Sequence, residues 1–130
     1  MGIENPEQKR ELTREEVATR LKERQGELFD KVGLGPSETP EQEAERNQLM
    51  REAGETGYLA AILRGEVLWG RSGPPKPADL LKVLEEKVAA REDIKAGRRR
   101  DTRWANSTPV EEEIERFQGQ IRILKETAGL

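Results

Sequence analysis

Apolar positions recur every three or four residues along most of the chain, which is the spacing of one face of an α-helix. The first stretch predicts a helix over residues 14–32 from four such positions: Val17, Leu21, Leu28 and Val32. Thr13 and Glu16 have the spacing of a capping box at its start, and Gly33 stands where a helix commonly ends. The chain therefore opens with a capped amphipathic helix.

The middle of the chain predicts two shorter helices, over residues 40–53 and 58–64. Thr39 is the expected N-cap of the first, and Gly65 ends the second. Glycines weaken helix interiors, and two of them interrupt the pattern between these stretches: Gly54 and Gly57. The segment YLAAILR carries the densest apolar face of the chain, so we expect it to lie in the core.

A proline-rich connector, RSGPPKP at residues 71–77, precedes a predicted helix over residues 78–96 that Gly97 ends. A last helix follows, with Ser107 or Thr108 as its cap and Pro109 at its first position. No stretch alternates with the period of a strand. The predicted fold class is all-α, a small bundle of about five helices that ends in a helical hairpin.

This pattern divides the chain into four parts. We expect residues 1–12 to form a flexible N-terminal arm and residues 13–70 to form a helical N-terminal unit. Residues 71–77 are the connector, and residues 78–130 form the C-terminal helical hairpin.

The last predicted helix carries the most regular seam, with apolar residues four and three apart as in a coiled coil: Val110, Ile114, Phe117, Ile121 and Leu124. One interpretation is that the seam packs on the preceding helix and forms core. The other is that it is offered to a partner protein or to a second copy of the chain. Two heptads are too few for a stable isolated coiled coil, so a partner seam would belong to a larger bundle.

The amino-acid composition excludes several kinds of catalytic and metal-binding site. The chain has no cysteine and no histidine, which removes thiol nucleophiles, disulfides and the commonest general base and metal ligand. Its carboxylates lie in runs typical of solvated helix faces, so we expect no enzyme, no cofactor and no metal. No apolar run is long enough to span a membrane, and we expect a cytoplasmic protein.

Charge is distributed unevenly along the chain. The formal net charge is −3, but residues 1–70 carry 10 basic and 15 acidic side chains, whereas residues 71–130 carry 13 basic and 11 acidic ones. The excess of positive charge lies mainly in KAGRRRDTRW, residues 95–104. Arginine and tryptophan are the usual anchors of interfaces, so we expect partner-binding residues of these types: Arg98, Arg99, Arg100, Arg103, Trp104 and Trp69.

Two functions fit these observations. The first is a non-enzymatic interaction module, such as an adaptor, an inhibitor or an assembly component, that docks on another protein through this arginine and tryptophan corner and through an amphipathic helix face. The second is a nucleic-acid-binding protein, in which the arginines contact phosphates and Trp104 stacks on a base. The low pI of about 5.3 favours the first function.

Overall fold

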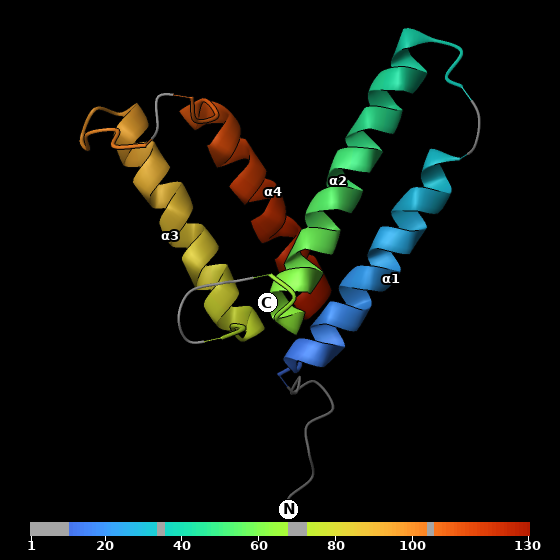
Figure 1. The fold of residues 1–130 in the computed structure, drawn as a ribbon, viewed down its shortest axis with the longest axis horizontal. Coiled ribbons are helices and arrows are strands. Elements are labelled where there is room, and N and C mark those ends of the chain that lie inside the picture. The colour runs from blue at the N-terminus through green and yellow to red at the C-terminus, as the bar shows by residue number, and fades with distance from the viewer. Residues whose placement is uncertain (1–10, 34–35, 68–72, 104–105) are drawn as a thin grey trace, which may run out of the picture.

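The computed structural model describes residues 11–33, 36–67, 73–103 and 106–130 (Figure 1). These segments contain four α-helices and no β-strand: α1 (Arg14–Val32), α2 (Pro40–Arg64), α3 (Pro77–Lys95) and α4 (Val110–Ala128). The all-helical class is confirmed. The expected number of five helices is wrong, because two of the predicted helices form one.

The long helix α2 runs for 25 residues without a break at Gly54 or Gly57. Neither glycine leaves the helical conformation, because α1 packs along this part of α2 and stabilises it. At Gly57 a β-carbon would overlap the side-chain amide of Gln25 on α1. That amide donates a hydrogen bond to the Ala53 carbonyl, at 3.1 Å. Gly57 is therefore a site of close helix approach and not a helix end.

The helix ends follow the predicted capping rules with one exception. At α1 the Thr13 hydroxyl accepts from the Glu16 amide at 3.2 Å, and the Glu16 carboxylate accepts from the Thr13 amide at 3.1 Å. At α2 the Thr39 hydroxyl accepts from the Gln42 amide at 3.1 Å. The exception is α4, which begins at Val110 with Pro109 as its N-cap and without a side-chain cap. The expectation that Pro109 opens this helix is wrong by one residue.

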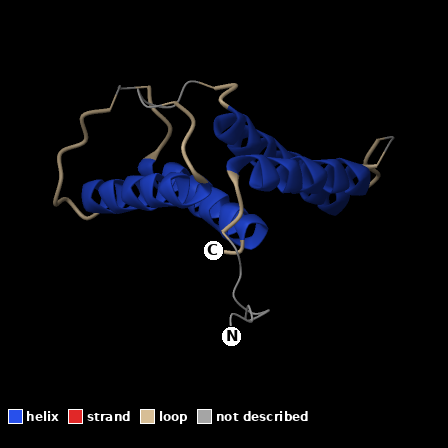
Figure 2. Ribbon diagram, turned by 90° about the horizontal axis from the view of Figure 1, so that it is seen from below, coloured by secondary structure: helices blue, strands red, loops and turns tan. Residues whose placement is uncertain are grey.

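The helices form two antiparallel hairpins, α1 with α2 and α3 with α4. The hairpins meet at one end, near the C-terminus, and diverge toward their connecting loops, so that Figure 1 shows a V. Figure 2 shows them side by side from below. Residues 95–103, which we call the arginine corner, therefore lie at the free tip of the C-terminal hairpin.

The core lies where the hairpins meet. It combines the first half of α1, the second half of α2, the first half of α3 and the second half of α4, and its fully buried large side chains include Leu21, Leu59, Ile62, Leu63, Leu80, Leu84, Ile123 and Leu124. By contrast, α2 has no buried residue before Ala53. The tips of the hairpins are too polar to bury a shared core, so the hairpins diverge toward them.

A set of ion pairs connects α1 to α2 and to α4 beside this core. The Arg24 guanidinium lies 3.2 Å from a Glu52 oxygen on α2 and 2.8 Å from a Glu126 oxygen on α4. Arg122 lies 3.6 Å from the same Glu52 carboxylate. These contacts fix where α4 crosses the first hairpin.

Candidate functional site

The arginine corner begins at the end of α3. Gly97 has a positive φ of 78°, and its amide donates to the Ile94 carbonyl at 3.1 Å. The Arg98 amide donates to the Asp93 carbonyl at 2.8 Å. This pair of bonds is a Schellman motif, which ends the helix and turns the chain away from its axis. The predicted stop at Gly97 thus determines the direction in which the following arginines leave the helix.

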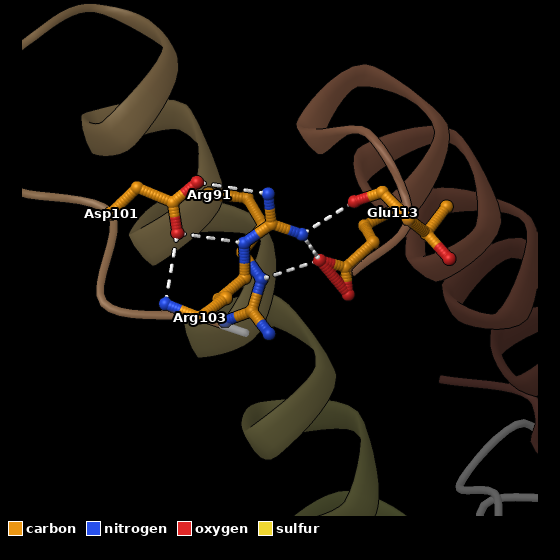
Figure 3. A network of polar contacts seen from close by, with 5 residues as sticks. Arg91, Asp101, Arg103 and Glu113 are labelled. Carbon is orange, nitrogen blue, oxygen red and sulfur yellow. Dashed lines mark hydrogen bonds and ion pairs between the residues drawn. The ribbon is translucent and has the colours of Figure 1, made fainter. Parts of the chain in front are cut away.

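Arg103 is held by a network of polar contacts that joins the loop to both helices (Figure 3). Its Nε and one terminal nitrogen donate to the two Asp101 carboxylate oxygens, each at 3.0 Å. Its other terminal nitrogen donates to the Thr108 carbonyl at 2.6 Å and to the Glu113 carboxylate on α4. Glu113 also accepts from Arg91 Nε on α3, at 3.4 Å.

This network removes Arg103 from the surface available to a partner. Its side chain is 16% exposed and that of Glu113 is 11% exposed. Every nitrogen of the guanidinium has an acceptor, and the bidentate contact with Asp101 is the strong form of an arginine–carboxylate pair. Arg103 therefore connects Asp101 and Thr108, which lie on either side of it in the chain, to α4.

Charge inside the network shifts its ionisation equilibria. The hydrogen bonds from the Arg103 side chain, followed by the one from its backbone amide, hold the pKa of the Asp101 carboxyl below its ordinary value of 3.8. The hydrogen bond to Asp101 raises the pKa of the Arg103 guanidinium above its ordinary value. Both groups therefore stay charged at physiological pH, and their ion pair persists there.

The remaining arginines of the corner differ in what they contact. Arg98 pairs with the Asp93 carboxylate at 2.9 Å on the open surface, where such a pair contributes little. Arg99 and Arg100 are exposed, and within the described segments their side chains make no hydrogen bond or ion pair. Two of the four predicted arginines thus have no side-chain partner among the described residues.

Arg99 and Arg100 border a hollow of about 310 Å³ on the outer face of α3. We call it the tip hollow. Its floor includes three partly buried apolar residues: Val83, Ala90 and Ile94. Lys87 and Arg91 lie along its edge, and Glu86 is the acidic residue there. The tip hollow combines an apolar floor with a basic rim, which is the make-up of a protein-docking surface.

The predicted helix seam lies mainly inside the chain. Ile114, Phe117 and Leu124 are buried, and Phe117 and Leu124 belong to the same core cluster as Leu84 of α3. Val110 and Ile121 are partly buried. This placement is the packing of a helical hairpin on its own core. The two predicted tryptophans, Trp69 and Trp104, lie outside the described residues.

Sequence reasoning missed three cations that gather around one aromatic ring. Lys87, Arg91 and Arg116 lie 5.7, 5.7 and 5.3 Å from the centre of the Phe117 ring. The i, i+4 spacing of Lys87 and Arg91 places both on one face of α3, and this is the signal that could have indicated them. The basic surface therefore extends from the loop into the space between the hairpins.

The described segments contain neither a metal-binding cluster of side chains nor a membrane-spanning helix. They contain no group of three or more His, Cys, Asp or Glu residues placed to hold a metal ion. None of their helices is both long and apolar enough to cross a membrane. Comparison with models of protein families, with curated proteins and with solved structures finds no match to this chain.

Proposed function

We propose that this protein is a non-enzymatic helical interaction module that docks on an acidic surface of another protein through Arg99 and Arg100. The observation that supports the proposal is the pair of exposed, unengaged arginines beside the apolar floor of the tip hollow. An adaptor, an inhibitor and an assembly component would each use such a surface. The proposal includes the cytoplasmic location expected from the sequence.

The arrangement of charge favours a protein partner over nucleic acid. At the corner Arg103 is engaged by its own network, so phosphates would meet the four exposed cations between Lys95 and Arg100. On a single strand each phosphate contact contributes about 0.7 to the slope of log affinity against log salt, so four contacts give a slope of only about −2.8. Nucleic-acid binding through so few phosphate contacts would depend on base stacking by Trp104. An acidic protein surface would pair its carboxylates with Arg99 and Arg100 and pack apolar side chains in the tip hollow.

The test is capture of partners from an extract of the native host. The wild-type protein, an Arg99→Ala/Arg100→Ala variant and an Arg14→Ala/Arg20→Ala control are immobilised, and bound proteins are identified by mass spectrometry. Arg14 and Arg20 are exposed on α1, far from the corner, so the control matches the loss of charge. Circular dichroism verifies that all three are equally helical.

We expect one protein partner to be captured by the wild type and the control and lost with the corner variant, with or without nuclease treatment. A Trp104→Ala variant tests the predicted tryptophan anchor in the same way. Equal capture by all variants would contradict the proposal. Capture that disappears on nuclease treatment would favour the nucleic-acid function instead.

A further inference from the structure

A second hollow, of about 420 Å³, opens between the two hairpins. We call it the cleft hollow. Residues of α2, α3 and α4 line it, so it exists only because the hairpins diverge. Leu84 and Phe117 line it but are almost fully buried, whereas Tyr58 of α2 lines it with 43% of its surface exposed. Its volume lies within the range of small ligand sites and exceeds that of one large side chain.

The charges around the cleft hollow are unequally engaged. Its two carboxylates already have partners, since Glu113 accepts from Arg91 and Arg103 and Glu55 accepts from the Gln120 amide. Arg116 contacts the Phe117 ring and has no carboxylate partner among the described residues. The wall of the cleft hollow formed by α3 and α4 therefore carries more positive than negative charge, and Glu55 lies on the wall formed by α2.

The cleft hollow is continuous with the docking surface proposed above. Lys87 and Arg91 line the cleft hollow and also the tip hollow that Arg99 and Arg100 border. An extended chain segment that lies across these two side chains would reach both hollows. The two hollows thus form one basic surface with an apolar depression at each end.

We infer that the cleft hollow is an anchor site for an aromatic side chain flanked by carboxylates on the partner protein. This inference rests on the proposed function and names the chemistry of the partner. An inserted ring would pack against the exposed ring of Tyr58, with the Arg116 guanidinium beside it. The flanking carboxylates pair with Arg116 on the basic wall and avoid Glu55.

The test uses defined peptides and not the native partner. A fluorescein-labelled peptide with one tryptophan between glutamates is titrated with the full-length protein, and binding is followed by fluorescence anisotropy. Two analogues replace the tryptophan by alanine or the glutamates by glutamine. A single-stranded oligonucleotide of similar length is measured in parallel, each at low and at physiological salt.

Three variants locate the binding. Arg116→Glu reverses the central charge of the basic wall and is expected to weaken binding of the tryptophan peptide by about tenfold or more. Lys125→Glu makes the same reversal on the exposed last turn of α4 and is expected to leave binding unchanged. Glu55→Gln removes the charge of the opposite wall and is expected to tighten binding by about threefold. A gain in affinity cannot arise from loss of folding.

The outcomes separate the two proposals. Weaker binding of both analogues, together with the three variant effects, supports the anchor site. Equal affinity for the tryptophan and alanine peptides overturns it, and if Arg99→Ala/Arg100→Ala still abolishes that binding, the proposed function stands alone. No binding of either peptide also overturns the anchor site and leaves the proposed function to its own capture experiment. Tighter binding of the oligonucleotide, with the same dependence on Arg116, overturns both in favour of nucleic acid.

Discussion

The two glycines inside α2 provide a quantitative test of how the first hairpin is packed. Gly54 has no atom within 4 Å of the place where a β-carbon would lie, whereas at Gly57 that place is filled by the Gln25 amide. Both residues are in the middle of the same helix, so replacement by alanine gives each the same gain in helix propensity, about 1 kcal/mol. The difference between the two variants therefore measures the contact with α1.

Gly54→Ala is expected to raise the free energy of unfolding by about 0.5–1 kcal/mol. Gly57→Ala gains the same amount but displaces the Gln25 amide from the Ala53 carbonyl, and a lost hydrogen bond of this kind costs about 0.5–1.5 kcal/mol. The two terms nearly cancel. The Gly57 variant should therefore be about as stable as the wild type, or slightly less stable.

Urea unfolding followed by circular dichroism at 222 nm measures both changes. With a slope of about 1–3 kcal/mol per molar urea, the Gly54 variant should shift the midpoint upward by a few tenths of a molar. Gln25→Ala is the control, since in that background Gly57→Ala meets no amide and should stabilise as Gly54→Ala does. Equal stabilisation by the two glycine variants in the presence of Gln25 would refute the close packing of α1 on α2.

Two further predictions concern the core and the corner. Leu124→Ala should destabilise the protein by about 3 kcal/mol, because Leu124 is fully buried where the hairpins meet, whereas Leu130→Ala at an exposed position should change the unfolding midpoint very little. Asp101 should titrate below 3.8 in a carboxyl NMR titration and return toward that value in Arg103→Ala. Since the folded pKa is the lower one, the stabilisation by Asp101 is complete above the unfolded pKa and is lost as the pH falls through the folded one.

Local patterns were sufficient to predict most of the helices. Thr13, Thr39 and Gly65 act on neighbouring backbone groups, so their positions in the sequence determine the helix ends. Gly54 and Gly57 gave the wrong result because the rule for glycine describes an isolated helix. The packing of Gln25 on α2 is a contact between distant residues, and only the hairpin reveals it.

The candidate site was predicted only in part for a similar reason. The sequence placed the arginines together, but it could not assign their partners. Asp101 lies two residues from Arg103 and could be anticipated, whereas Glu113 approaches Arg91 and Arg103 because α4 returns antiparallel to α3. Because these contacts engage Arg103, Arg99 and Arg100 are the stronger candidates for binding a partner.

The confinement of the shared core to one end of the V has a consequence for how the chain folds. Most contacts between helices lie within each hairpin, so each can close by joining segments that are near neighbours in the sequence. Closing such short loops has a small entropic cost, and topologies of this kind fold quickly. We therefore expect the docking of the two hairpins on each other, through Leu21, Leu63, Leu80 and Leu124, to be the slower event.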